Sequence, residues 1–322
     1  MFLTNFTTYY LAADTLVQNI MTQEVYHIPA LLPQTLEALD IRPDGTYIDA
    51  TFGGGGHSRA IVDKLGPDGH LYSFDQDEDA LKNAIDSPVF TMVYGNFRFI
   101  SNFMRYYGVE HVDGILADLG VSFHHFDDAS RGFSFRSDGA LDMRMNRHAT
   151  KTAATILQEY SEQQLANIFY LYGELKQSRR IASAIVSARQ HESIDTVGKL
   201  IAICTPLINP QKEKKELACI FQALRIEVNG ELDVLRSFLE QSVKLLDKGG
   251  RLAILTYHSL EDRLVKNFMK FGNFEGKPRK DFFGRIDAPL KQLTSKPIVP
   301  SDDEIAVNPR SRSAKLRVAE KI

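Results

Sequence analysis

The sequence predicts an α/β protein whose sheet is open, mostly parallel and about seven strands wide, with an all-helical domain inserted into it. Two observations predict this class. Between residues 46 and 119, β-type apolar runs alternate with helical stretches, an arrangement that forms parallel strands joined by right-handed crossovers. Between residues 150 and 247 the apolar spacing is helical throughout, and about a hundred residues are too many for a single crossover.

Turn residues and alternation define the separate elements. A Pro-Asp-Gly turn at residues 43–45 precedes the first strand, and a glycine pair at 249–250 ends the helical insertion. Near the C-terminus, residues 297–299 are strand-like, and the alternation at residues 316–318 is typical of an edge strand, so we expect an antiparallel last hairpin. The other strands are predicted at residues 46–52, 70–75, 89–94, 111–119 and 251–256, with helices at 58–65, 78–85 and 99–107 between the first four.

This pattern divides the chain into three parts. Residues 1–25 lack a clear period and are predicted to be an N-terminal extension, while residues 26–39 contain a short helix. Residues 26–149 and 248–322 together form the α/β domain, and residues 150–247 form the helical insertion.

Composition excludes several classes of protein. The 322 residues are 43% hydrophobic and 25% charged, which is ordinary for a globular protein. The two cysteines, Cys204 and Cys219, form no CxxC pair and no Cys/His cluster, so we expect neither disulfides nor a structural metal. The first basic residue is Arg42, and no apolar run approaches the ~20 residues of a membrane span, so we expect a cytoplasmic protein without a membrane partner. Monomer and homodimer both stay open.

Charge is unevenly distributed along the chain. The net charge is −3, but residues 266–322 contain 13 Lys and Arg against 7 Asp and Glu, a balance of +6. Lys277, Arg279 and Lys280 stand there beside Phe282 and Phe283, a basic and aromatic combination suited to nucleic acid. A solvated charged face is the alternative interpretation.

Residues 47–58, YIDATFGGGGHS, are the predicted ligand loop. A strand that stops at glycines and continues as a helix offers backbone N–H groups to a ligand, because glycine permits the closest approach. Asp49 precedes the glycines, and Ser58 stands where a dinucleotide loop would have its third glycine. Asp75 follows Gly53 by the roughly 20 residues at which a carboxylate meets ribose hydroxyls. Together these spacings favour S-adenosylmethionine over NAD.

Three more side chains lie at or just beyond the ends of predicted strands at the same edge of the sheet. Phe97 is placed to cover an adenine ring, although a core position is an equal alternative. Asp118 ends the fourth strand, where an acid is costly to bury without a partner, so we expect a functional role. His258, directly after the fifth strand, either contacts the substrate base or caps the next helix.

The stretch from residue 118 to residue 147 interleaves arginines with phenylalanines. Arg131, Arg136 and Arg144 are candidates to bind phosphate, and the aromatic rings could stack on an unpaired RNA base. A lid over the cofactor is the alternative. His124 and His125 are adjacent, but no third ligand lies at a suitable spacing, which again argues against a metal.

With these motifs in hand, the chain closely resembles the family of 16S ribosomal RNA cytosine-N4 methyltransferases. The resemblance runs from about residue 26 to the C-terminus and is carried by the segments TFGGGGHS, FDQD, GNF, DGILADLGVS, RGFSF, DGALDMRM, FQALRIEVN, YHSLEDR and NPRSRSAKLR. It implies a class I S-adenosylmethionine-dependent methyltransferase fold with a helical insertion. It also implies methylation of the exocyclic N4 of a cytidine in the 16S rRNA of the small ribosomal subunit.

The resemblance implies a set of cofactor contacts, which fall on Gly55, Gly56, His57, Asp75, Phe97, Asp118 and His125. The chain departs from the family pattern at two of its positions. His125 stands where the family has glutamine, and Gly54 stands where it usually has arginine. The first departure puts one hydrogen bond in doubt, and the second loosens the glycine loop.

Several rival functions are considered. An NAD-linked dehydrogenase would share the sheet and Asp75 but gives no reason for the basic, aromatic loop. A non-enzymatic RNA-binding protein would not bind S-adenosylmethionine. A methyltransferase for another RNA or for DNA is closer, but DNA enzymes often carry Asn/Asp-Pro-Pro-aromatic where this chain has DLGV from Asp118.

The implied chemistry requires a hydrogen-bond acceptor for the target amine. The lone pair of a cytosine N4 amine is delocalised into the ring, so orientation and proximity are the expected main effects. Asp118 is the leading candidate to accept an N–H of this amine, and His258 is the second.

Overall fold

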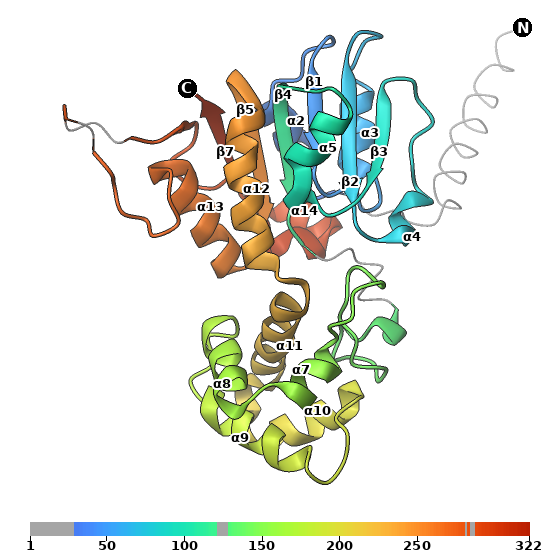
Figure 1. Cartoon of the computed structure of the whole chain (residues 1–322), viewed down its shortest axis with the longest axis vertical. Coiled ribbons are helices and arrows are strands. Elements are labelled where there is room, and N and C mark those ends of the chain that lie inside the picture. Colours follow the sequence, from blue (N-terminus) through green and yellow to red (C-terminus); the bar gives the residue numbers. More distant parts are fainter. Residues whose placement is uncertain (1–28, 121–127, 281, 284–286) are drawn as a thin grey trace, which may run out of the picture.

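The computed structural model describes residues 29–120, 128–280, 282–283 and 287–322, and its sheet is the centre of the upper part of the molecule in Figure 1. The predicted N-terminal extension, residues 1–25, lies outside the described residues. The strands of the sheet are β1 (Thr46–Asp49), β2 (His70–Asp75), β3 (Phe90–Tyr94), β4 (Val112–Asp118), β5 (Leu246–Thr256), β6 (Leu290–Gln292) and β7 (Lys315–Lys321).

The sheet has the order β3-β2-β1-β4-β5-β7-β6. The first five strands in this order pair in parallel, whereas β7 is antiparallel to both β5 and β6. The predicted open sheet of about seven strands with an antiparallel end is therefore confirmed. Because β1 lies between β2 and β4, the carboxyl ends of these three strands meet at one edge, where ligands bind in such sheets.

The last hairpin differs from the prediction in two details. The strand paired with β7 is Leu290–Gln292, whereas residues 297–299 contribute only one isolated bridge, from Ile298 to Leu316. In addition, β7 is an inner strand, because β6 covers its outer side. The alternation around Arg317 was assigned to an edge strand, but the Arg317 guanidinium is buried, where it donates to the Asp262 carboxylate at 2.7 and 3.2 Å.

Successive strand residues point to opposite faces of the sheet and build two cores. Ile48, Ile115 and Ile254 pack on one face, and their neighbours Tyr47 and Leu116 pack on the other. The first face is covered by α5 (Ile100–Tyr106), α12 (Glu231–Leu245) and α13 (Ser259–Phe271), and the second by α2 (Leu32–Leu39) and α3 (Gly56–Val62). Two short helices, α4 (Glu78–Leu81) and α14 (Asp302–Val307), follow β2 and precede β7.

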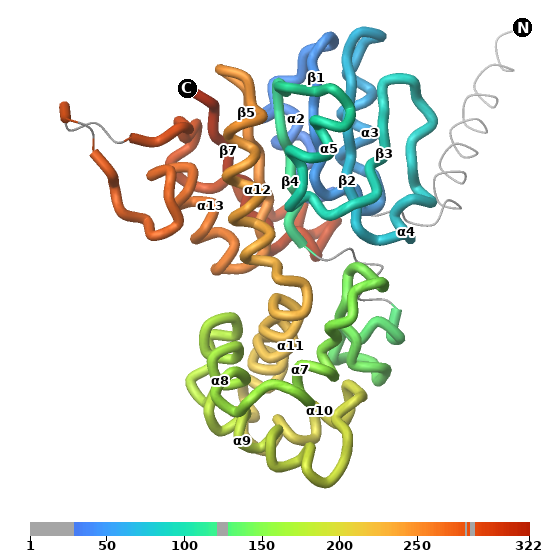
Figure 2. The backbone as a smooth tube through the Cα atoms, viewed as in Figure 1, coloured from blue at the N-terminus to red at the C-terminus, as the bar shows by residue number. Residues whose placement is uncertain are grey.

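A helical unit with its own core lies below the sheet in Figures 1 and 2. Its core also takes in Phe133, Leu141 and Met143 from the segment before the first of these helices. The helices are α7 (Ala153–Glu159), α8 (Glu162–Leu171), α9 (Ser178–Ala188), α10 (Val197–Cys204) and α11 (Glu213–Asn229). No helix in the described ranges has both the length and the apolar character needed to cross a membrane.

Helix α12 was assigned to the helical insertion by its period, but it packs with the sheet. Gly230, in the left-handed conformation with φ 61°, separates α12 from α11. Leu235, Phe238 and Leu239 of α12 are buried in the core that contains β4 and β5. Periodicity identifies a helix but not the surface that buries its apolar side, so this packing was not accessible from the sequence.

We expect the substitution Phe238→Ala to destabilise the α/β part of the protein. The Phe238 ring is fully buried between α12 and the sheet, and removal of such a ring costs about 3–5 kcal/mol of unfolding free energy. Urea unfolding measures the change. Tyr170→Ala on α8, where the side chain is 64% exposed, is the matched control and should change stability by less than about 0.5 kcal/mol. Equal stability of the two variants would contradict this packing.

Candidate active site

The glycine loop after β1 has a backbone that requires glycine. Gly53 and Gly55 have φ of 53° and 77°, and a Cβ at Gly55 would lie 2.7 Å from the Phe52 ring. A Cβ at Gly56 would overlap the Pro29 ring. The loop therefore turns sharply over Phe52 and enters α3, as the glycine run predicted.

Asp75 at the end of β2 stabilises this loop by hydrogen bonds. Its Oδ2 accepts the Gly53 N–H at 2.8 Å, and its Oδ1 accepts the Asp77 N–H at 2.9 Å. A carboxylate oxygen can accept more than one hydrogen bond, so these two bonds do not by themselves prevent Asp75 from binding a ligand hydroxyl. The predicted convergence of Asp75 and the glycine loop is present.

Asp49 is a buried anchor behind the loop. It is 1% exposed, and its Oδ2 accepts the Ser58 hydroxyl at 2.6 Å while its Oδ1 accepts the Thr51 N–H at 3.0 Å. The Ser58 Oγ also lies 2.8 Å from the Ser73 Oγ on β2. Burial raises the pKa of Asp49, and the Ser58 hydrogen bond opposes the rise. Asp49 therefore shapes the loop and is too enclosed to contact a ligand.

Asp118 at the end of β4 lies on the other side of β1. Its Oδ1 accepts the Tyr257 hydroxyl at 2.8 Å, and its backbone N–H donates to Thr51 Oγ1 at 2.6 Å. The side chain is 23% exposed. Burial raises the pKa of Asp118 to about 6; the Tyr257 hydrogen bond opposes this rise, and the nearby Glu261 charge adds to it.

His57, the second residue of α3, joins the glycine loop to Asp118. The residue is 6% exposed, its Nε2 lies 3.2 Å from the Ala30 carbonyl oxygen, and its Nδ1 lies 3.6 Å from Asp118 Oδ2. Burial lowers the pKa of His57, although the Asp49 charge opposes this effect. The imidazole is therefore neutral near pH 7.

Phe97 begins a short 3₁₀ helix (η1, Phe97–Phe99) after β3. Its ring is half-buried, and its edge contacts Phe238 at a centroid distance of 5.1 Å. Asn96, before it, donates from Nδ2 to Gln76 Oε1 at 2.8 Å, which ties the ends of β2 and β3 together. Phe97 is thus partly a core residue and partly available at the site, so both interpretations of it have a structural basis.

His258 caps α13. Its Nδ1 accepts the Glu261 N–H at 3.4 Å, so the ring N–H is at Nε2. Nε2 is buried and lies 3.1 Å from Glu261 Oε1, but it makes no well-aligned hydrogen bond in the described part of the chain. Of the two roles considered for His258, the structure gives it the capping role.

Glu231, His258 and Glu261 form a cluster whose ligand atoms all lie within 4.8 Å of one another, a set that could surround a metal ion. Two features oppose this use. Arg225 already donates to both oxygens of Glu231, at 2.9 and 3.0 Å, and the capping bond leaves a proton on His258 Nε2. The cluster instead lies where the start of α12 meets the start of α13.

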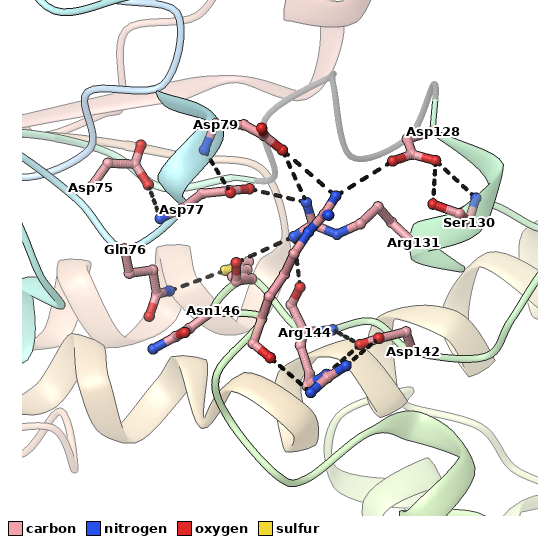
Figure 3. A network of polar contacts seen from close by, with 12 residues as sticks. Asp75, Gln76, Asp77, Asp79, Asp128, Ser130, Arg131, Asp142, Arg144 and Asn146 are labelled. Atoms are coloured by element: carbon pink, nitrogen blue, oxygen red, sulfur yellow. Dashed lines mark hydrogen bonds and ion pairs between the residues drawn. The ribbon is translucent and has the colours of Figure 1, made fainter. Parts of the chain in front are cut away.

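Figure 3 shows that the arginine-rich segment is held by intramolecular contacts, with Arg131 at their centre. Arg131 is 3% exposed; it donates to Asp77 Oδ2 at 3.2 Å and to the carbonyl oxygens of Arg144 and Met145 at 2.8 and 3.2 Å. This segment includes a 3₁₀ turn (η2, Ala129–Arg131). The expected RNA contact of Arg131 is not compatible with this burial, because a buried arginine must be paired within the protein.

Arg144 is also used inside the protein. It donates to both oxygens of Asp142 at 2.7 Å and to the carbonyl oxygens of Arg147 and Ala149 at 2.9 and 2.6 Å. These bonds close the loop on itself and engage the Arg144 guanidinium with partners inside the protein, while its side chain stays 24% exposed. Sequence spacing alone could not distinguish an arginine that stabilises its own loop by internal hydrogen bonds from an arginine that binds phosphate.

The other predicted RNA contacts are exposed. Arg136, Lys277, Arg279 and Lys280 all have exposed side chains, and Phe282 and Phe283 are 97% and 80% exposed. His125 lies outside the described residues, as do His124 and Phe126. The structure thus brings Gly55, His57, Asp75 and Asp118 together at one edge of the sheet and separates them from the basic C-terminal segment.

Tyr257 is the site residue that the sequence interpretation missed. It follows β5, which pairs with β4 so that Leu255 lies opposite Asp118. A polar aromatic residue just beyond that register position can reach the carboxylate on the neighbouring strand. The pairing of β4 with β5 was therefore the information needed to find it.

Comparisons with known proteins agree on one family. The chain matches the model of the MraW methylase family over residues 24–322. Ribosomal RNA small subunit methyltransferase H of Bacteroides thetaiotaomicron is 59% identical over 296 residues, which cover 92% of this chain and 97% of that protein. The protein of the same name from Porphyromonas gingivalis is 56% identical over 306 residues, 93% of this chain and 98% of its own length.

A solved structure, the putative rRNA-methylase from Clostridium thermocellum, aligns over 92% of this chain and 100% of that chain at 12% identity, with a TM-score of 0.43. The family model covers the whole α/β part and the helical unit described above. This chain belongs to the MraW methylase family.

Proposed function

We propose that this chain transfers a methyl group from S-adenosylmethionine to the exocyclic N4 of a cytidine in the 16S rRNA of the small ribosomal subunit. The observation that carries the proposal is the meeting of Asp75, the glycine loop and Asp118 at one sheet edge. The fold is that of class I S-adenosylmethionine-dependent methyltransferases. The named relatives, more than half identical in sequence, support the rRNA substrate.

The residues at this edge fit S-adenosylmethionine. Asp75 can accept hydrogen bonds from the ribose hydroxyls, and the space beside Gly53, where a Cβ would meet no atom within 4 Å, lets a ligand approach the loop backbone. Phe97 offers a half-buried ring for the adenine. When bound, the cofactor supplies an electrophilic methyl group on a positively charged sulfur.

Asp118 is suited to orient the target amine. Tyr257 fixes one carboxylate oxygen, while the partly exposed side chain leaves the other able to accept an N–H from the cytosine. A carboxylate also stabilises the positive charge that develops on nitrogen as the C–N bond forms. Proximity and orientation of the amine and the methyl group then supply most of the rate enhancement, because the transfer requires no covalent intermediate with the protein.

The basic C-terminal segment is proposed to hold the RNA backbone. Lys277, Arg279 and Lys280 are exposed, and Phe282 beside them is available to stack on an unpaired base. Arg136 is the remaining exposed candidate of the arginine-rich segment, since Arg131 and Arg144 have internal partners.

Nucleoside mass spectrometry tests the proposal. Small ribosomal subunits from a strain that lacks the gene are incubated with the purified protein and S-adenosylmethionine, and the 16S rRNA is then analysed. N4-methylcytidine should appear only with the active protein. A methyl group on another base, or no methylation although the cofactor binds, would refute the proposed function.

We expect Asp118→Asn to slow methyl transfer about 10²-fold to 10⁴-fold in single turnover with saturating cofactor, because the amide no longer accepts a proton. The wild-type rate should fall as pH decreases through about 6, where the Asp118 carboxylate becomes protonated and ceases to act as an acceptor. The rate of the variant should not show this decrease at low pH. A variant that methylates at the wild-type rate would show that Asp118 is not the acceptor.

Replacement of Arg279 and Lys280 by glutamine should weaken RNA binding at low salt and reduce the salt dependence by about one unit of slope per lost phosphate contact. Fluorescence anisotropy at several salt concentrations measures this slope. Lys244 and Lys248 are exposed cations of α12 and β5, and their replacement by glutamine is the charge-matched control. Identical slopes for the two double variants would exclude Arg279 and Lys280 from the RNA contact.

A further inference from the structure

In the contact between His57 and Asp118, two atoms with lone pairs face each other and no hydrogen lies between them. A carbonyl oxygen can only accept a hydrogen bond, so the 3.2 Å contact with Ala30 places the imidazole proton on His57 Nε2. Nδ1 then presents a lone pair. It faces Asp118 Oδ2 at 3.6 Å, and an ionised carboxylate also presents lone pairs there.

The two carboxylate oxygens of Asp118 differ in their hydrogen bonds. Asp118 Oδ1 accepts the Tyr257 hydroxyl, whereas no hydrogen bond among the described residues donates to Oδ2. His57 is 6% exposed, and Asp118 is 23% exposed on the side of the site. The pair therefore joins a partly exposed carboxylate to a buried imidazole that water reaches poorly.

We propose that His57 holds the proton released in the reaction: Asp118 Oδ2 takes it from the methylated amine and passes it to His57 Nδ1. This inference rests on the proposed function, since it concerns the amine that is methylated there. His57 acts through Asp118 and is therefore a positioning residue. The resemblance implied only a cofactor contact for it.

The atoms and electrons balance. Methyl transfer forms one C–N bond and breaks one C–S bond, whose electron pair stays on sulfur. The cytosine nitrogen then carries a positive charge, and it loses one proton to Asp118 while keeping the N–H electron pair. The Nδ1 lone pair of His57 accepts this proton, which gives an imidazolium beside a carboxylate.

Two carboxylates offset part of the cost of this temporary charge. A buried cation is costly unless it is paired, and burial lowers the pKa of His57. The protonated ring would have Asp118 on one side and the Asp49 charge nearby, which opposes the effect of burial. After the product leaves, the exposed part of Asp118 returns the proton to water. No group beyond those in the site is required.

The tautomer of His57 gives a direct test. Nitrogen NMR of the intact, ¹⁵N-histidine-labelled wild-type protein resolves Nδ1 from Nε2, and the His57 signals are identified by their loss in the His57→Gln variant. We expect a neutral ring protonated on Nε2 near pH 7, with an Nδ1 shift that changes in Asp118→Asn. A ring protonated on Nδ1 would overturn the proposal, because that nitrogen could not accept a proton.

Single-turnover kinetics test the coupling. Glutamine at position 57 can still donate to the Ala30 carbonyl but cannot hold a proton, so His57→Gln should methylate at least about tenfold more slowly than wild type when S-adenosylmethionine is saturating. The double variant with Asp118→Asn should be no slower than Asp118→Asn alone, since both residues serve one step. Multiplied effects, or a wild-type rate for His57→Gln, would overturn the proposal.

His111→Gln is the matched control, because His111 lies at the opposite end of the sheet and its side chain is 55% exposed. It should methylate at the wild-type rate. If the wild-type protein binds the cofactor and yet methylates no small subunit, the proposed function fails. The NMR measurement on the wild-type protein still decides whether His57 can accept a proton.

Discussion

The site depends on a buried carboxylate at the end of the first strand. Asp49 is nearly inaccessible, and an ionised carboxylate in that position is tolerated only if hydrogen bonds replace its water. The Ser58 hydroxyl and the Thr51 N–H supply them, and each comes from the segment that carries the glycines. Thr51 in turn accepts the N–H of Asp118, so one anchor sets the position of the loop and of the neighbouring strand end.

A second set of buried polar contacts joins the helical unit to the sheet. Arg131 bridges Asp77, directly after β2, and the carbonyl oxygens of the loop that leads into α7. Glu231 and Arg225 form a similar pair at the junction of α11 and α12. Arg131 donates to three partners, whereas Arg225 makes two bonds to the single Glu231 carboxylate. Both uses suit a planar donor group that stays charged when buried. The helical unit is therefore joined to the α/β part by two largely buried arginine contacts.

Much of the fold was accessible from the sequence because local patterns determine it. The alternation of strands and helices, the glycine turn and the spacing of Asp75 depend on nearby residues, and the structure confirmed the sheet that they predict. The failures concern contacts between distant segments. The burial of Arg131, the packing of α12 and the inner position of β7 depend on which surfaces meet in three dimensions. Tyr257 was missed for the same reason, since its partner lies 139 residues earlier in the chain.

Asp77 connects the Asp75 carboxylate to the helical unit. Its backbone N–H binds the carboxylate of Asp75, and its side chain binds Arg131. Asp75 and the contact that anchors the helical unit thus lie within a single turn of the chain, shown in Figure 3. A shift of the helical unit relative to the sheet would therefore reach Asp75, which we propose to bind the cofactor ribose, through two hydrogen bonds.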